Sequence, residues 1–274
     1  MLNKKVTFLG AGNMGASLLR GALRSGELRP EDVTVVEIDV ARAKALEKEF
    51  GVAVVNDPVA AVPGADILLI AVKPFSLGAL LDQIRGVCSG KELLVSIVAG
   101  VEGGYIRDRI GKDNPVVRVM PNLAATVDEA ASAIAACPPA DDAHLDLAER
   151  LFASVGEVVR VAESQLDAVT GLSGSGPAYI FLVLEGLCDG GVRMGLTMDV
   201  ARKLAVQTVL GAAKLVKESG EHPAVLKSQV TTPAGTTIAG LRALENQAVH
   251  AAFMNAVEAA SNRSRELGDA ARGA

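Results

Sequence analysis

A short strand that runs directly into a glycine-rich turn constrains the fold of this chain more than any other feature. Residues 6–9 read Val-Thr-Phe-Leu, and the next six are Gly10-Ala11-Gly12-Asn13-Met14-Gly15, with the spacing GxGxxG. In this pattern the first glycine permits a tight turn, the second lets backbone N–H groups approach a pyrophosphate, and the third lets a helix pack close to the strand. The same spacing also occurs in turns without a ligand, so its context has to decide.

The residues that follow have the spacing of a mononucleotide-binding unit. Residues 16–24 carry apolar side chains at helical spacing, and residues 33–36 form a β-branched run typical of a buried parallel strand. Glu37 ends that run, 22 residues beyond Gly15, where an acidic side chain accepts hydrogen bonds from the adenosine ribose. The context therefore predicts a dinucleotide site, although a solvated carboxylate at a strand end gives the same sequence.

The residues around Glu37 bear on the choice between NADH and NADPH. A carboxylate repels a 2′-phosphate, and Ile38 places no cation beside it, so the local charge favours NADH. Arg42 lies one helical turn further on and is able to reach back to a phosphate. The cofactor is therefore expected to be NADPH or NADH, with NADH as the hypothesis that the carboxylate supports.

Short apolar runs alternate with helical stretches up to about residue 160. The further expected strands are residues 67–72, 93–98, 116–120 and 158–161. This alternation predicts an α/β fold whose N-terminal domain, residues 1–163, is a Rossmann-type doubly wound parallel sheet that binds the dinucleotide. Ligands of such sheets lie at strand ends. Three runs end in turns that suit this role, namely Lys73-Pro74, Ala99-Gly100 and Pro121-Asn122, although Pro and Gly also simply stop strands.

The strand pattern ends near residue 165, and residues 164–274 are expected to form an all-helical domain for substrate binding and dimerisation. Long helices are predicted over residues 178–194, 199–217 and 247–267. Residues 178–187 are apolar almost all the way round, and a helix of that kind has to be buried on every side. Because about a hundred residues cannot bury it alone, we expect it to pack against a second subunit.

Two turns in the helical region carry chemical groups. Residues 171–178 read Gly-Leu-Ser-Gly-Ser-Gly-Pro-Ala, with Pro177 where a first helical turn tolerates it. The run lacks the GxSxG spacing of a hydrolase elbow, since Ser175 stands where glycine is needed. Residues 231–237 hold four threonines and a glycine ahead of apolar residues at helical spacing. Such a helix start offers N–H groups and hydroxyls to a small carboxylate, although it also suits a plain helix cap.

Composition excludes several other classes of function. The net charge is −5 and only eight of 274 residues are aromatic, which disfavours nucleic-acid binding. The three cysteines and three histidines are scattered, so neither disulfides nor a metal site is expected. The first strand begins too early for a signal peptide, and no apolar run approaches the roughly 18 residues of a membrane span. A cytoplasmic location without membrane or nucleic-acid partners is therefore expected.

Four stretches together resemble pyrroline-5-carboxylate reductase across almost the whole chain. They are residues 10–15, 71–74, 171–179 and 230–241, of which the last is the most specific. The resemblance implies NAD(P)H-dependent reduction of the cyclic imine pyrroline-5-carboxylate to L-proline, the final step of proline biosynthesis. It also implies helical C-terminal domains that interlock as dimers, often assembled into decamers.

The resemblance further implies roles for individual residues. Thr237 is expected to be the catalytic hydroxyl beside the ring nitrogen, while Thr232 and the backbone N–H groups of Gly235 and Thr236 hold the substrate carboxylate. Cofactor contacts are expected from Gly10, Gly12, Asn13, Met14, Gly15, Glu37, Ala71, Val72, Lys73, Pro74, Ala99 and Gly100.

The sequence departs from the common family pattern at three points. Ala234 stands where Gly is frequent, Thr232 where Ser is frequent, and Leu123-Ala124 where Thr-Pro is frequent.

Two rival functions remain open. One is a 2-hydroxyacid dehydrogenase, which needs a His or Lys base that neither of the two turns in the helical region contains. The other is a nucleotide-sensing protein without turnover, which the hydroxyl-rich turn disfavours.

Overall fold

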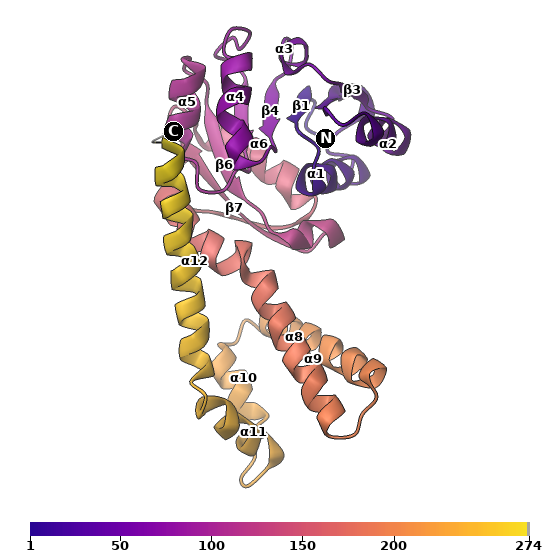
Figure 1. Ribbon diagram of the computed structural model, residues 1–274, viewed down its shortest axis with the longest axis vertical. Coiled ribbons are helices and arrows are strands. Elements are labelled where there is room, and N and C mark those ends of the chain that lie inside the picture. The colour runs from indigo at the N-terminus through magenta and orange to yellow at the C-terminus, as the bar shows by residue number, and fades with distance from the viewer. Residues whose placement is uncertain (273–274) are drawn as a thin grey trace. The chain divides into compact units, whose positions relative to one another are not determined.

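The computed structural model describes residues 1–272 and divides the chain into two compact units (Figure 1). The first unit contains residues 1–175 together with the end of the chain from residue 258, and the second contains residues 176–257. The end of the chain therefore returns to the unit in which it begins. The expected domain boundary between residues 163 and 164 stays a prediction.

The first unit is built on one sheet of eight strands. Their order is β3-β2-β1-β4-β5-β6-β7-β8, and β1 to β6 run parallel to one another. Strand β7 pairs antiparallel with β6 and parallel with β8, so the last two strands run the opposite way. The bounds are β1 Val6–Leu9, β2 Val33–Val36, β3 Ala53–Val55, β4 Ile67–Ile70, β5 Leu93–Ser96, β6 Val116–Met120, β7 Ala130–Cys137 and β8 Gly156–Arg160. The predicted Rossmann-type sheet is confirmed, with one antiparallel pair added.

Helices cover both faces of this sheet, as a doubly wound fold requires. One apolar core lies under α1 (Asn13–Arg24), α2 (Val40–Phe50) and α6 (Asp142–Ala153), and includes Leu18 and Phe152. The other core lies under α3 (Pro58–Ala61), α4 (Pro74–Ile84) and α5 (Gly103–Ile110). Strands β1, β4 and β5 are buried along their whole length because both faces are covered. This core fixes the strand ends that carry the expected cofactor residues.

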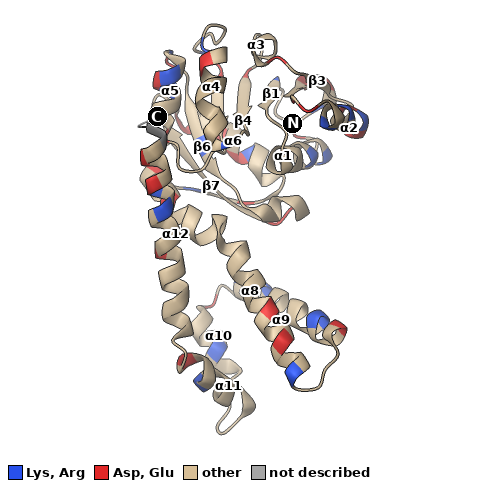
Figure 2. Ribbon diagram, viewed as in Figure 1, with Lys and Arg blue, Asp and Glu red and all other residues tan. Residues whose placement is uncertain are grey.

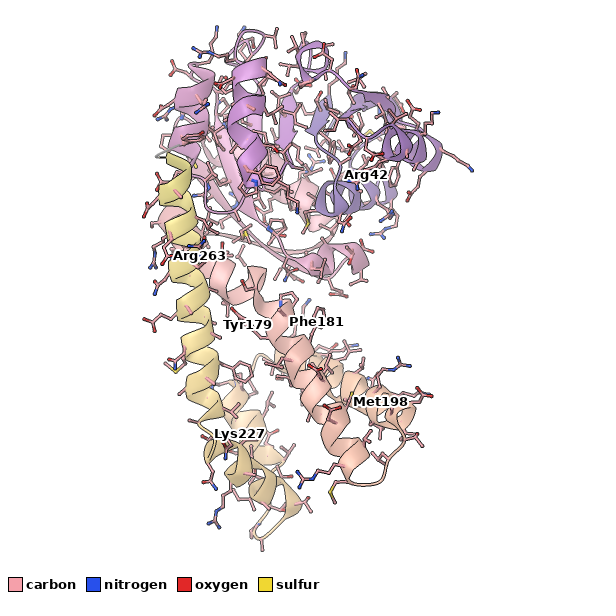
Figure 3. All side chains as sticks on the ribbon, viewed as in Figure 1. Arg42, Tyr179, Phe181, Met198, Lys227 and Arg263 are labelled. Atoms are coloured by element: carbon pink, nitrogen blue, oxygen red, sulfur yellow. The ribbon has the colours of Figure 1, made fainter. Side chains whose placement is uncertain are left out.

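The second unit is made of helices that leave large apolar side chains exposed. It holds α8 (Gly176–Arg193), α9 (Met198–Ser219), α10 (Pro223–Gln229), α11 (Thr236–Glu245) and the first part of α12 (Val249–Arg272). Figure 2 shows α8 and the first part of α12 with few charged residues. Phe181 and Met198 project from α8 and α9 with 57% and 50% of their surface exposed (Figure 3).

A single chain therefore does not bury helix α8. Ile180 and Leu182 are 44% and 68% exposed, and the buried apolar residues within 176–257 are only Cys188, Ala201 and Ala205. A unit with so small a core cannot offset the conformational entropy of its own ordering. Such exposure of apolar side chains is expected of a helix that a second subunit covers.

None of the helices formed by residues 1–272 combines the length and the apolar character needed to cross a membrane.

Candidate active site

The glycine turn after β1 forms an open cradle at the end of the strand. Gly10 adopts φ +98°, and a Cβ there would lie 3.0 Å from the Ala71 carbonyl oxygen. A Cβ on Gly15 would lie 2.8 Å from the Gly10 carbonyl oxygen, so the close start of α1 also requires glycine. Gly12 caps α1 without a side-chain hydrogen bond, and the nearest atom to its missing Cβ is 3.9 Å away. The backbone fits a pyrophosphate, because Gly12 leaves space beside N–H groups at a helix start.

The cradle lies where the strand order of the sheet reverses. Strand β1 is flanked by β2 on one side and by β4 on the other, with β5 beyond β4. Such a switch point is the ligand crevice of open α/β sheets. Asn13 and Met14 form the first turn of α1, Glu37 follows β2, Ala71 to Pro74 follow β4, and Ala99 and Gly100 follow β5. The structure thus brings the expected cofactor residues to one edge of the sheet.

Glu37 is held at the end of β2 by its own loop. Its Oε1 accepts a hydrogen bond from the Asp39 N–H at 3.0 Å, and its side chain is only 9% exposed. The Arg42 guanidinium lies 3.9 Å from Glu37 Oε2 and is half exposed (Figure 3). A carboxylate and a cation therefore both lie beside the cradle, as the sequence indicated.

The loop after β4 packs directly against the glycine turn. The Ala71 N–H donates to the Leu9 carbonyl at 3.0 Å, and Val72 Cγ1 lies 3.1 Å from the position of a Gly10 Cβ. Lys73 is the N-cap of α4 and Pro74 its first residue, so these two residues begin a helix at the same edge. The loop after β4 is therefore in direct contact with the glycine turn.

Two exposed apolar side chains at this edge were given no ligand contact by the expectations from the sequence. Ile38, directly after Glu37, is 81% exposed, and Phe75, directly after Pro74, is 88% exposed. Large apolar side chains beside a polar cradle are typical of ligand sites. The sequence feature that could have identified them is an apolar residue that directly follows the acidic residue at a strand end, as Ile38 does, or the first residues of a helix, as Phe75 does.

The threonine-rich turn before α11 leaves polar groups free. The Gly235 N–H donates to the Thr232 carbonyl at 3.1 Å, and a Cβ on Gly235 would lie 2.3 Å from Thr232 Oγ1. The Thr231 hydroxyl donates to the Lys227 carbonyl at 2.7 Å. Within residues 1–272, no hydrogen bond involves the hydroxyls of Thr232, Thr236 or Thr237, and α11 has no side-chain cap. The N–H groups of the first helical residues point out of the helix start.

The expected contact of the Gly235 N–H with the substrate carboxylate stays a prediction. The Gly235 N–H closes the turn, and the N–H groups of Thr236 and Thr237 at the start of α11 are free. Gly235 also lets Thr232 approach the helix start. The threonine residues all belong to the second unit and the cofactor residues all belong to the first.

The two remaining turns singled out in the sequence pack against each other within the first unit. Asn122, after β6, donates from Nδ2 to the Ser173 carbonyl at 3.1 Å. Ser173 lies in a π-helical turn, Thr170–Gly174, and a Cβ on Gly174 would lie 2.5 Å from Met120 Cε. Gly174 therefore allows this turn to pack closely against Met120 at the end of β6. Single π-turns are frequent at functional sites.

A partly buried ion pair anchors the loop that follows β5. Glu163 Oε1 accepts from the Gly103 N–H at 2.7 Å and from Arg118 Nη1 at 3.1 Å. Burial alone would raise the pKa of Glu163, but hydrogen bonds from Gly103, Cys137 and Arg118 outweigh it and hold the pKa below the usual value. Burial is also the main cause that raises the pKa of Cys137 to about 12. Glu163 is therefore charged, and it fixes the first turn of α5.

The lowered pKa of Glu163 predicts a pH-dependent contribution to stability. A carboxyl group whose pKa is depressed by folding stabilises the protein above its unfolded pKa of about 4.3, and this contribution is lost as the pH falls through the folded pKa. Glu163→Gln should thus melt below the wild type at neutral pH, with a difference that shrinks on acidification. Melting temperatures of both proteins between neutral and acidic pH test this. A constant difference would show that the charge of Glu163 contributes nothing.

No group of three or more His, Cys, Asp or Glu side chains in the described part of the chain is arranged to hold a metal ion. Cys88, Cys137 and Cys188 are free and buried.

Comparisons with known proteins find similarity over almost the whole chain. Residues 163–267 match a family model described as pyrroline-5-carboxylate reductase dimerisation, and residues 5–100 match one described as NADP oxidoreductase coenzyme F420-dependent. The pyrroline-5-carboxylate reductase of Methanosarcina acetivorans is 47% identical over 268 residues, covering 98% of this chain and 99% of the relative. That of Arabidopsis thaliana is 44% identical, covering 96% and 95%.

Solved structures of similar proteins cover the same length. A pyrroline-5-carboxylate reductase from Coxiella burnetii has a TM-score of 0.90 and 33% identity, covering 96% of this chain and 98% of that one. The Plasmodium falciparum pyrroline carboxylate reductase, solved with NADP bound, has a TM-score of 0.88 and 30% identity, covering 98% and 99%.

Proposed function

The chain belongs to the pyrroline-5-carboxylate reductase family, and we infer that it reduces L-1-pyrroline-5-carboxylate to L-proline with NAD(P)H, the final step of proline biosynthesis. The main support for this function is the 47% identity to the Methanosarcina acetivorans reductase over 98% of the chain. The matched length includes both the glycine cradle and the threonine turn. The protein is therefore an NAD(P)H-dependent oxidoreductase acting on a cyclic imine.

The cradle and its neighbouring loops would hold the cofactor. When bound, NAD(P)H supplies the hydride that the imine carbon receives. Gly10, Gly12 and Gly15, with Asn13 and Met14 at the start of α1, would hold the pyrophosphate, and Glu37 would hold the adenosine ribose. The strand order places the loops after β4 and β5 on the opposite side of the cradle from Glu37. Ala71 to Pro74, Ala99 and Gly100 would therefore face the nicotinamide half.

The threonine turn would hold the substrate. Thr232 Oγ1 and the N–H groups of Gly235 and Thr236 would bind the carboxylate, since they lie together at the start of α11, where negative charge is favoured. Thr237 would place its hydroxyl at the ring nitrogen, which must hold or gain a proton as the carbon accepts hydride. The turn contains no His or Lys. A hydrogen-bonding hydroxyl is sufficient because the product amine, unlike an alcohol substrate, does not have to be deprotonated.

The charge at the end of β2 predicts a preference for NADH. The carboxylate of Glu37 would repel a 2′-phosphate, and Arg42, whose guanidinium lies 3.9 Å from it, is a cation that could offset that repulsion. We expect a higher kcat/KM with NADH than with NADPH, and we expect Glu37→Gln to shift the ratio towards NADPH by about tenfold, since like-charge contacts cost up to several kcal/mol. Glu47→Gln, on the exposed side of α2, serves as the control. A large advantage of NADPH in the wild type would contradict the preference.

The helical region matches a dimerisation model, and the chain self-associates. We propose that the assembly is at least a dimer in which the exposed face of α8 is covered by a second copy. The resemblance to the family adds the decamer as a higher assembly to be tested.

The proposed location is the cytoplasm. Support comes from three cysteines that are free and buried, as expected for a protein of a reducing compartment.

Nicotinamide absorbance tests the function directly. Purified protein is mixed with pyrroline-5-carboxylate and either NADH or NADPH, and the fall in absorbance is followed together with proline formation. We expect one proline for each cofactor oxidised. Absence of oxidation with both cofactors would contradict the proposed function and favour a nucleotide-binding protein without turnover.

A further inference from the structure

The loop between β5 and α5 is fixed at both ends. At its start, the Ile97 N–H donates to the Ile70 carbonyl at 3.1 Å. At its end, the Gly103 N–H donates to Glu163, and a Cβ on Gly103 would lie 2.4 Å from Cys137 Sγ. Only the middle of the loop, around Ala99 and Gly100, lacks support from the sheet itself.

The last helix of the chain supports that middle section. Gly100 adopts φ +76°, and a Cβ there would lie 3.1 Å from the Ser264 carbonyl oxygen of α12. A Cβ on Gly268 would lie 2.2 Å from the Gly100 carbonyl oxygen. The two backbones touch only because both residues are glycine. The contact lies within the first unit, to which residues 258–272 belong.

Helix α12 is itself attached to the first unit beside this contact. The Ser264 hydroxyl donates to Asp167 Oδ1 at 2.6 Å, and Ser264 is 4% exposed. Arg265 Nε lies 3.9 Å from Asp167 Oδ2. Asp167 belongs to α7 (Leu166–Val169), which directly follows the turn containing Glu163. The helix therefore has a defined register against the loop.

We propose that α12 positions the β5–α5 loop for the nicotinamide half of the cofactor, with Gly268 and Ser264 as positioning residues. The proposal rests on the function proposed above, because the loop faces a ligand only if the cradle binds NAD(P)H. The strand order separates two halves of the site, since Glu37 and the glycine turn serve the adenosine and pyrophosphate half and the β5 loop serves the other. A displaced loop should therefore weaken binding of the whole dinucleotide and spare a ligand that lacks the nicotinamide.

Gly268→Ala tests this separation. The new methyl group would overlap the Gly100 carbonyl, so the loop or the helix end must shift by about 1 Å, a misplacement that costs up to about a hundredfold in a positioned site. By calorimetry we expect the Kd of the preferred cofactor, NADH or NADPH, to rise about tenfold or more. We expect the Kd of ADP to stay within about twofold, because the cradle is unchanged.

Two further variants make the comparison decisive. Gly104→Ala is the matched control, because its added Cβ meets nothing within 4 Å although it lies beside Gly103, and both affinities should be unchanged. Ser264→Ala removes one hydrogen bond and adds no atoms, so it reports on the same contact should Gly268→Ala fail to fold. A rise of about threefold in the Kd of the dinucleotide is expected for it, with ADP binding unchanged.

Each outcome decides the proposal. Weakened dinucleotide binding with intact ADP binding supports it, in Gly268→Ala or, failing that, in Ser264→Ala. Equal weakening of both ligands, or no weakening of either, overturns it and leaves the proposed function standing when the wild type still oxidises NAD(P)H. A wild type that binds neither NADH nor NADPH overturns both.

Discussion

Thr237→Ala is expected to lower kcat by roughly ten- to a thousandfold, the general effect of removing one positioned polar group from an active site. The hydroxyl of Thr237 makes no hydrogen bond within residues 1–272, and it lies in the first turn of α11, behind a turn held by the Gly235–Thr232 hydrogen bond. Its removal therefore leaves no other protein group unsatisfied. The loss should fall on the chemical step, with the Kd of NAD(P)H unchanged because the cradle belongs to the first unit.

Two companion variants separate the hydroxyl from the shape of the side chain. Thr237→Ser keeps the hydroxyl and should retain most of the activity, whereas Thr237→Val keeps the shape and should be as slow as the alanine variant. Single-turnover rates and cofactor affinities of the three proteins supply the comparison. An unaffected rate in the valine variant would remove Thr237 from the mechanism.

Phe181→Glu is expected to abolish self-association. Phe181 is 57% exposed in the single chain and lies on α8 between Ile180 and Leu182, which are also exposed. In an assembled protein this face is expected to be covered, and a carboxylate buried there without a partner costs far more than the phenyl ring contributes. The variant should elute as a monomer and lose activity, because the second unit has almost no core of its own to hold α11 in place.

Size-exclusion chromatography with light scattering measures this outcome. Val127→Glu is the matched control, since Val127 is 67% exposed but lies in the first unit, and its assembly should be unchanged. A wild-type protein that is a stable, active monomer would refute the role assigned to α8.

The sequence predicted those parts of the fold that carry strong local patterns. The β-branched runs at residues 33–36 and 116–120 became strands β2 and β6 with the expected bounds. The pattern missed β3, which has three residues at the sheet edge, and β7, whose sequence Ala-Ala-Ser-Ala-Ile-Ala-Ala-Cys has low strand propensity. Strand β7 forms because two neighbouring strands supply hydrogen bonds and burial, which no local pattern records.

The sequence likewise predicted some positions of the candidate site and missed some of its contacts. The positions of Gly10, Gly15 and Glu37 followed from spacing, because their roles depend on one continuous unit of strand, turn and helix. The contacts made by Gly100 did not, since they involve a helix more than 160 residues later in the sequence. Likewise, the hydrogen bond of the Gly235 N–H inside its own turn appeared only in the structure.

Transfer of deuterium from NAD(P)H to proline measures the central assignment most directly. The protein is given pyrroline-5-carboxylate and cofactor carrying deuterium at both C4 positions of the dihydronicotinamide, and the proline formed is analysed by mass spectrometry and NMR. If the chain is an imine reductase, each proline gains one deuterium on the ring carbon bonded to nitrogen, opposite the carboxylate-bearing carbon. Proline without label, or labelled cofactor that is never oxidised, would contradict the assignment.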